Sequence, residues 1–291
     1  MAYPKPAPDQ ILIENSPAAL RRWCAARRRA GERIGLVPTM GALHEGHLAL
    51  VTALHAKVDR VIVSIFVNPT QFAPGEDYAR YPRSENADLE KLSAMGVDLA
   101  YLPTPQAMYP QGFTTEIAVG GPLSEVLEAV VRPGHFTGVA TVVAKLLLQA
   151  MPDVAAFGEK DYQQLQIIRR MAVDLDLPVE ILPVKTVRDA HGLALSSRNA
   201  YLTDPERDTA RRLNTILAAA ARSLRAGASG PHACAQAEAA LIAAGFTSVD
   251  YVAFADPDTL APLSRFEGKG RLLAAARIGK TRLIDNIAVG I

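Results

Sequence analysis

The stretch IGLVPTMGALHEGHLAL, residues 34–50, decides the fold that the sequence predicts. It opens with a short apolar run typical of a buried strand, passes through a glycine-containing turn, and takes on helical periodicity from about residue 46. The run VIVSIFV at 61–67 repeats the strand pattern. Strand, helix and strand in succession indicate parallel strands joined by a right-handed crossover.

The same alternation continues along the chain. Ser16 and Pro17 have the pattern of an N-cap and first helical residue, and Gly31 offers a left-handed stop to the helix that they open. Later helices are expected from about 84, around 138–150 and from about 161, with apolar strand runs at 97–102, 154–157 and 179–184. We therefore predict an α/β fold with a doubly wound, Rossmann-like parallel sheet in residues 1–186.

The pattern changes in residues 187–291. Two alanine-rich helical stretches, roughly 204–226 and 231–244, precede the strand-like runs SVDYVAFA, RLLAAARI and TRLIDNIAV. The intervening AGASGP is expected to form a tight turn between two helices of one unit. This part is predicted to be a smaller α+β domain.

The composition restricts the function classes. Of 291 residues, 49% are hydrophobic and 21% charged, which is typical of a globular protein, and the net charge of +1 argues against a generic nucleic-acid or membrane-surface binder. Cys24 and Cys234 show no disulfide or zinc-ligand spacing. The first ten residues lack the apolar region of a secretion signal, and no uncharged apolar run reaches 18 residues, so a cytoplasmic location is expected.

Two histidines lie where the helix after the first strand of this alternation is expected to begin. His44 and His47 are three residues apart, which places both imidazoles on one helical face. The free N–H groups and positive dipole end of a helix N-terminus favour an anion, so the turn predicts a nucleotide triphosphate site. The alternatives are a structural histidine and a truncated zincin motif, but the latter needs HExxH and a third ligand. No metal ligands are predicted.

Three other polar strings follow predicted strands. In IFVNPTQF, residues 65–72, Asn68 and Gln71 could orient a polar substrate, or Asn68 could simply initiate an Asn-Pro turn. In FGEKDYQQLQIIRR, residues 157–170, Lys160 could neutralise phosphate or be an exposed lysine. In the predicted hairpin VRDAHGLALSSRNAYL, residues 187–202, the sequence SSR could clamp phosphate oxygens or form a surface turn.

Four strings of this sequence resemble strings that occur in the same order in the pantothenate synthetase family: PTMGALHEGH, NPTQF, GEKDYQQ and LSSRN. That family belongs to the HxGH nucleotidyltransferase superfamily. The resemblance implies an ATP-dependent ligase that condenses pantoate with beta-alanine to give pantothenate, AMP and pyrophosphate through a pantoyl-adenylate. It also implies a homodimer and Mg²⁺ held mainly by the ATP phosphates.

The resemblance assigns roles residue by residue. His47 corresponds to the proton donor, and His44 and Lys160 act beside it as catalytic residues. Gln71 and Gln164 correspond to substrate-binding glutamines, and Asn68 is likewise expected to bind substrate. The remaining ATP-binding positions implied are Met40, Gly41, Ala42, Leu43, Glu45, Gly46, Gly158, Glu159, Asp161, Val187, Leu195, Ser196, Ser197 and Arg198, besides His44, His47 and Lys160.

Several residues keep open alternatives. His135 in RPGHFTGV, a stretch similar to one in the family, is interpreted as structural, with a place at the site as the alternative, and Tyr81 and Arg83 receive no role. Asp88 is expected to serve a helix dipole, with magnesium ligation as the alternative. The competing functions are a nucleotidylyltransferase that moves AMP or CMP onto a phosphate, and a regulatory module that binds a nucleotide without chemistry.

Overall fold

The computed structural model describes residues 11–290 and consists of two compact units. The N-terminal unit contains residues up to 119 together with Arg132–Glu159 and Ile167–Lys185. The C-terminal unit contains residues from 186 onward together with two earlier segments, Gly120–Val131 and Lys160–Gln166. The first ten residues, whose composition argued against a secretion signal, lie outside the described part of the chain.

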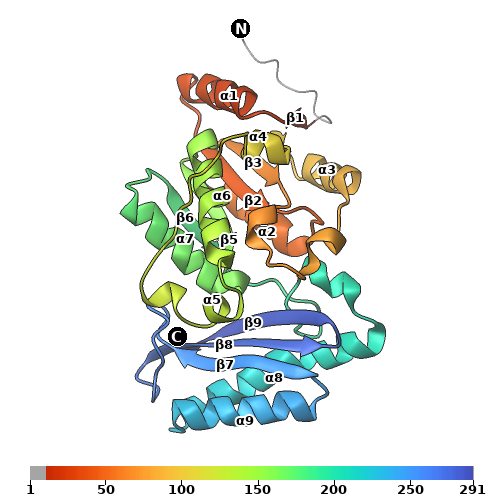
Figure 1. The fold of residues 1–291 in the computed structure, drawn as a ribbon, viewed down its shortest axis with the longest axis vertical. Coiled ribbons are helices and arrows are strands. Elements are labelled where there is room, and N and C mark those ends of the chain that lie inside the picture. The colour runs from red at the N-terminus through yellow and green to blue at the C-terminus, as the bar shows by residue number, and fades with distance from the viewer. Residues whose placement is uncertain (1–10, 291) are drawn as a thin grey trace. The chain divides into compact units, whose positions relative to one another are not determined.

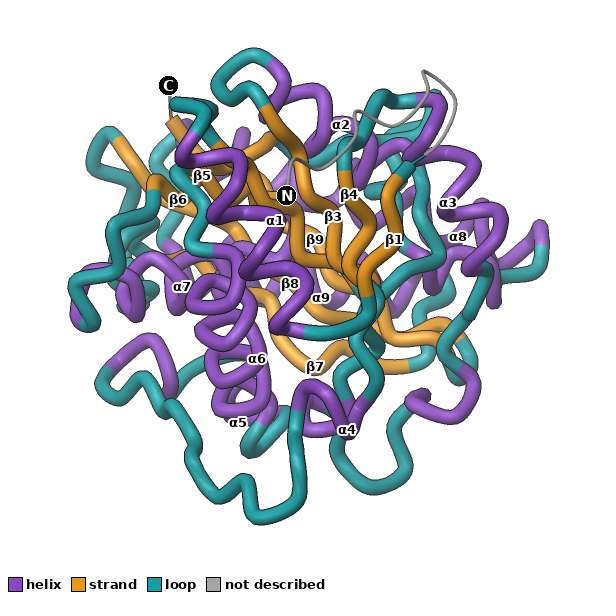
Figure 2. The backbone as a smooth tube through the Cα atoms, turned by 90° about the horizontal axis from the view of Figure 1, so that it is seen from above, coloured by secondary structure: helices purple, strands orange, loops and turns teal. Residues whose placement is uncertain are grey.

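The N-terminal unit is built on a six-stranded parallel sheet, as the alternating pattern predicted (Figure 1). Its spatial order is β1 (Leu12–Glu14), β4 (Leu99–Tyr101), β3 (Arg60–Ile65), β2 (Ile34–Thr39), β5 (Val154–Gly158) and β6 (Glu180–Val184). Figure 2 shows β1, β4 and β3 side by side. From β2 the chain proceeds to β3 and β4 on one side, and from β5 to β6 on the other. The order therefore reverses between β2 and β5, the point where doubly wound sheets bind ligands.

The helices of this unit follow the predicted alternation, except for the four-residue helix Pro105–Met108, which was not predicted. They are α1 (Pro17–Arg29), α2 (Glu45–His55), α3 (Glu85–Ala94), α4 (Pro105–Met108), α6 (His135–Ala150) and α7 (Tyr162–Asp174), whose first turn belongs to the C-terminal unit. The predicted start of α1 is confirmed, because the Ser16 side chain accepts a 3.2 Å hydrogen bond from the backbone N–H of Ala19. Gly31 follows the helix with a φ of 78°.

Strand residues on one face of this sheet are buried beneath α2 and α3. Val37, Val61 and Val154 pack in one cluster with Leu54 of α2 and Leu92 of α3. The intervening strand residues, such as Leu36 and Ile62, are also fully buried. Burial on both faces explains why these strands are continuous apolar runs in the sequence.

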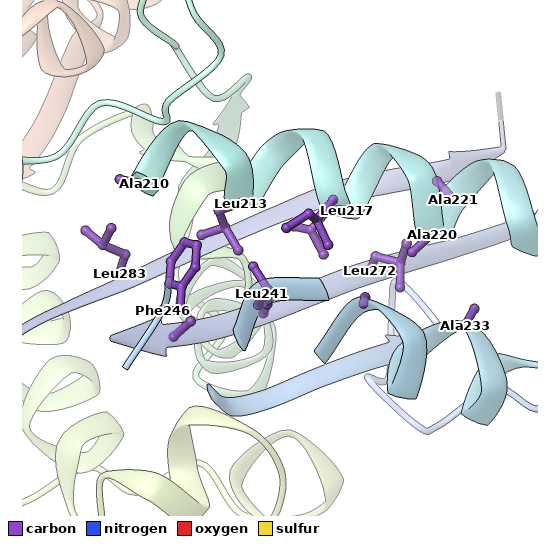
Figure 3. Packing of buried hydrophobic residues seen from close by; sticks show 14 of the residues in the cluster. Ala210, Leu213, Leu217, Ala220, Ala221, Ala233, Leu241, Phe246, Leu272 and Leu283 are labelled. Carbon is purple, nitrogen blue, oxygen red and sulfur yellow. The ribbon is translucent and has the colours of Figure 1, made fainter. Parts of the chain in front are cut away.

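The C-terminal unit is the predicted α+β fold. Three antiparallel strands, β7 (Ser248–Ala255), β8 (Lys269–Ile278) and β9 (Thr281–Gly290), lie in that order and pack against α8 (Asp204–Arg225) and α9 (Gly230–Ala243). A short helix, α5 (Glu128–Val131), also belongs to this unit. Figure 3 shows Leu213, Leu217, Leu241 and Leu272 in the core between helices and sheet. None of the helices within residues 11–290 has the length and apolar character to cross a bilayer.

Candidate active site

The histidine turn connects β2 to α2. His44 is the N-cap of α2, close to the predicted start of the helix, and its Nδ1 accepts a 3.1 Å hydrogen bond from the backbone N–H of Gly46. The Nδ1 of His47 accepts in turn from the backbone N–H of His44 at 3.3 Å, and the ring centroids are 4.1 Å apart. Because each Nδ1 accepts a hydrogen bond, the proton of each neutral ring is on Nε2. Both imidazoles are thus donors at a helix N-terminus, where an anion is favoured.

The turn before these histidines has a left-handed backbone that helix α3 holds in place. Gly41 and Ala42 have φ values of 80° and 51°. The carboxylate of Asp88, 1% exposed, accepts 2.8 Å hydrogen bonds from the backbone N–H groups of Ala42 and Leu43. Lys91 donates to the carbonyl of Leu43 at 2.6 Å. Both carboxylate oxygens of Asp88 therefore hold the turn.

Gln71 lies beside the same turn. It ends a short 3-10 helix, Pro69–Gln71, that follows β3. Its side-chain amide nitrogen lies 3.3 Å from the sulfur of Met40, and its amide oxygen accepts from Asn68 at 3.1 Å. The structure thus brings the strings PTMGALHEGH and NPTQF together at the carboxyl ends of two neighbouring strands, as expected from their positions in the sequence.

Asn68 is buried behind Gln71. Its side chain is 1% exposed, and its amide oxygen accepts from the Tyr109 hydroxyl at 2.8 Å and from the Thr70 hydroxyl at 3.0 Å. Its amide nitrogen donates to Gln71 and to the carbonyl of Gly138. The amide is thus engaged by the protein, so the geometry favours Asn68 as the residue that orients Gln71 rather than as a substrate contact.

A second group of residues, which the sequence analysis did not identify as functional, holds the backbone of Gln71. His135 Nδ1 donates to the carbonyl of Gln71 at 2.8 Å, and Arg132 donates to the same oxygen at 3.3 Å. Arg132 also makes two 2.7 Å hydrogen bonds to Glu76. Burial alone would raise the pKa of Glu76, but the Arg132 guanidinium outweighs it and holds that pKa below its ordinary value. His135, interpreted from the sequence as structural, thus contacts the backbone of the predicted substrate glutamine.

The GEKDYQQ string passes from β5 of the N-terminal unit into the C-terminal unit. Gly158 ends β5, and Glu159 begins the 3-10 turn Glu159–Asp161. In the C-terminal unit, the Lys160 ammonium lies 3.6 Å from an Asp161 carboxylate oxygen, and the Lys160 carbonyl accepts from Asn286 at 2.9 Å. Gln164 is partly exposed in the first turn of α7.

The predicted hairpin at 187–202 is confirmed. Arg188 and Ala194 form an antiparallel bridge, and the backbone N–H of Leu195 donates to the carbonyl of Val187 at 2.9 Å. Ser196 then caps the 3-10 helix Ser197–Tyr201 by accepting from the backbone N–H of Arg198 at 3.3 Å. The SSR sequence is therefore a capped turn with partly exposed side chains, which suits contact with an anion.

The predicted site residues form one set in each unit. Those of the N-terminal unit are Met40–His47, Asn68, Gln71, Gly158 and Glu159, and those of the C-terminal unit are Lys160, Asp161, Gln164, Val187 and Leu195–Arg198. No group of three or more His, Cys, Asp or Glu side chains within residues 11–290 could hold a metal ion.

Known proteins resemble this chain along nearly its whole length. A family model described as pantoate-beta-alanine ligase matches residues 12–288. The chain is 58% identical over 277 residues to the pantothenate synthetase of Mesorhizobium japonicum, covering 95% of this chain and 97% of that one. It is 54% identical over 279 residues to the pantothenate synthetase of Paramagnetospirillum magneticum, covering 96% and 98%.

Solved structures show the same fold. A crystal structure of pantothenate synthetase from Thermus thermophilus matches with a TM-score of 0.91 and 48% identity, covering 97% of this chain and all of that one. A crystal structure of pantoate-beta-alanine ligase from Francisella tularensis, complexed with beta-gamma ATP and beta-alanine, matches with a TM-score of 0.82 and 33% identity. It covers 96% of this chain and 97% of that one.

Proposed function

The chain belongs to the pantoate-beta-alanine ligase family, and we propose that it condenses pantoate with beta-alanine after ATP has activated the pantoate carboxylate. The observation that carries the proposal is the pair of imidazoles at the start of α2, each with its Nδ1 occupied by a backbone N–H. These donors follow β2, next to the reversal of strand order where doubly wound sheets bind ligands. The beta-gamma ATP and beta-alanine complexed with the Francisella relative support the same substrates.

In the first proposed step, a pantoate carboxylate oxygen attacks the α-phosphorus of ATP. The new P–O bond gives pantoyl-adenylate, and the bond to pyrophosphate breaks. His44 and His47 can donate Nε2–H to the phosphate oxygens as negative charge moves onto the leaving group. Lys160, Ser196, Ser197 and Arg198 are proposed to stabilise the same charge. None of these roles needs a covalent bond to the enzyme.

In the second proposed step, the neutral amine of beta-alanine attacks the pantoyl carbonyl carbon. An amide bond forms, AMP leaves with the electrons of the C–O bond, and the amine loses its proton. Gln71 is proposed to orient pantoate and beta-alanine for this attack, and Gln164 to contact pantoate. The amine is neutral and the acyl carbon is already activated, so the rate of this step depends mainly on how the two groups are positioned.

Magnesium is proposed to enter with ATP, held mainly by the phosphates. No group of three or more His, Cys, Asp or Glu side chains within residues 11–290 could hold the ion, so the ATP phosphates would supply most of its ligands.

Three further expectations belong to this proposal. The homodimer rests on the family resemblance, and the cytoplasmic location rests on Cys24 and Cys234, which lack the spacing of a disulfide framework. The division into domains 1–186 and 187–291 is supported by the start of a long continuous segment of the C-terminal unit at Thr186.

The direct test incubates the purified protein with ATP, pantoate and beta-alanine and follows AMP, pyrophosphate and pantothenate. We expect equal amounts of the three products, and product formation that stops when either pantoate or beta-alanine is omitted. Transfer of a nucleotide onto a phosphorylated acceptor without beta-alanine would instead indicate a nucleotidylyltransferase. ATP binding with no product under any of these conditions would indicate a regulatory module.

A further inference from the structure

Two consecutive polar residues interrupt the apolar strand β9. Leu283 and Val289 belong to the core against the helices, so odd-numbered residues of β9 point to the helix-covered face of the sheet. Asp285 points to that face, and Asn286 points to the opposite one. Both are buried, at 3% and 4% exposed. Burying a carboxylate and an amide next to each other is costly unless each is fully paired.

Asp285 is paired with the hairpin that precedes the SSR turn. Its two carboxylate oxygens accept 2.7 and 2.8 Å hydrogen bonds from the two terminal nitrogens of Arg188. The same guanidinium donates to the carbonyls of Gly192, inside the hairpin, at 3.0 Å and of Asn286 at 3.3 Å. A bidentate pair of this kind fixes direction as well as distance. Asp285 therefore sets the orientation of the hairpin that leads into Ser196.

Asn286 is paired with the other predicted ATP-binding string of the C-terminal unit. Its amide nitrogen donates to the carbonyl of Lys160 at 2.9 Å, and its amide oxygen accepts from Arg271 at 2.7 Å. The Arg271 guanidinium stacks 3.6 Å from the ring centroid of Tyr162. Asn286 thus binds the backbone of Lys160 directly, and it holds the Tyr162 ring through Arg271.

We propose that Asp285 and Asn286 are positioning residues that present the Lys160 turn and the Ser196–Arg198 turn together to ATP. The inference rests on the proposed function for the identity of the ligand. Whatever the ligand, strand β9 fixes two segments that are remote in the sequence, because neighbouring residues of a strand point to opposite faces. Neither residue touches the substrate in this account, and each acts through the segment it holds.

The test measures ATP binding directly, by titration calorimetry with a non-hydrolysable ATP analogue and no pantoate. Asp285→Asn removes the charge, and Asn286→Asp replaces the donor to the Lys160 carbonyl with an acceptor. We expect each to raise the Kd for the analogue about tenfold, the order of effect that follows loss of a charged or buried hydrogen bond. Asp250→Asn is the matched control, since Asp250 lies in the same sheet and accepts from Arg282 at 2.6 Å without touching either ATP-binding segment.

Kinetics separate positioning from a general loss of stability. In the complete reaction, Asp285→Asn and Asn286→Asp are expected to raise the KM for ATP and leave the KM for beta-alanine within about twofold. The Asp250→Asn control is expected to lower the unfolding midpoint without changing either KM. If Asp285→Asn and Asn286→Asp only lower the midpoint, as the control does, the two residues merely support the sheet and the proposal is wrong.

A second variant covers the case in which the buried substitutions prevent folding. Arg188→Lys changes the partly exposed partner, keeps the charge and loses the bidentate geometry, and is also expected to weaken binding of the analogue. An Arg188→Lys protein that folds and binds the analogue normally would overturn the Asp285 half of the proposal. Wild-type protein that binds the analogue but forms no pantothenate would refute the proposed function while leaving the binding comparison valid. Wild-type protein that binds no analogue would refute both.

Discussion

His135 and Gln71 are joined by a 2.8 Å hydrogen bond from the imidazole Nδ1 to the backbone carbonyl oxygen of the glutamine. On the other side of the ring, Nε2 lies 3.0 Å from a terminal nitrogen of Arg132, which can only donate. The ring is therefore a neutral Nδ1–H tautomer between an acceptor and a donor. This arrangement ties the first turn of α6 to the loop that carries the proposed substrate glutamine.

Replacing His135 with alanine is expected to lower turnover about tenfold and to raise the KM for pantoate and beta-alanine more than that for ATP, because the position of Gln71 is released. Steady-state kinetics with each substrate varied in turn check this. His55→Ala is the matched control, since His55 also bonds a backbone carbonyl, that of Met95, at 3.0 Å, but is exposed at the end of α2. Equal kinetic effects of the two substitutions would contradict the role of His135.

Gly138 is expected to tolerate no side chain. A Cβ at this position of α6 would lie 2.4 Å from the carbonyl oxygen of Thr70 and 2.8 Å from the backbone nitrogen of Gln71. Gly138→Ala should therefore displace the Gln71 loop, lower the free energy of unfolding by about 1–3 kcal/mol and reduce turnover. Urea unfolding and turnover, compared with Gly120→Ala, where a Cβ meets nothing within 4 Å, check the prediction. Wild-type stability and activity in Gly138→Ala would show that the loop position is unimportant.

The sequence predicted the sheet and the starts of the main helices because their signals are local. The N-cap of α1 at Ser16 and the apolar run of β2 can be recognised without knowing what they contact. Strand β1 was not predicted, since its three residues are too few to show a period. Helix α6 begins at His135, earlier than expected, because Gly134 takes up a left-handed conformation just before it.

The residues that hold the site could not be predicted from the sequence, because their roles depend on partners far along the chain. Asp88 resembles any acid in the first turn of a helix, and only the structure shows that it binds the turn 45 residues earlier. Asn286 lies in a strand with no recognised functional string, and its partner Lys160 is 126 residues away. The motifs thus identify candidate ligand contacts, whereas the tertiary structure identifies what positions them.

Asp88→Asn is expected to disturb the histidine turn, although the asparagine side chain has nearly the same shape as the aspartate. One acceptor oxygen becomes an NH₂ group facing a backbone N–H of Ala42 or Leu43, which should cost about 1–3 kcal/mol of unfolding free energy. The rate of pantoate-dependent pyrophosphate exchange should fall as well. Glu85→Gln, an exposed change in the first turn of the same helix, serves as control. An Asp88→Asn protein with normal stability and exchange would mean that α3 does not position the turn.

The Glu76–Arg132 pair predicts a pH-dependent contribution to stability. The pKa of Glu76 is lowered in the folded state, since Arg132 outweighs the effect of burial. When the pKa of a carboxyl group is lower in the folded than in the unfolded state, its ionised form stabilises the folded protein at pH values above the unfolded pKa of about 4.3. This stabilisation is lost as the pH falls through the pKa of the folded state. Wild type should therefore exceed Glu76→Gln in unfolding free energy at pH 7, and the difference should shrink below about pH 5. A difference that stays constant down to pH 3 would contradict the ion pair.

The most direct measurement of the central claim is pantoate-dependent exchange of labelled pyrophosphate into ATP, without beta-alanine, in wild type and His47→Ala. The account predicts exchange by the wild type under these conditions, because adenylation precedes amide formation. In the variant it predicts exchange slower by about two to three orders of magnitude, since one preorganised donor to the transition state is worth about 3–4 kcal/mol. Exchange at a near-normal rate in His47→Ala, or wild-type exchange that requires beta-alanine, would contradict it.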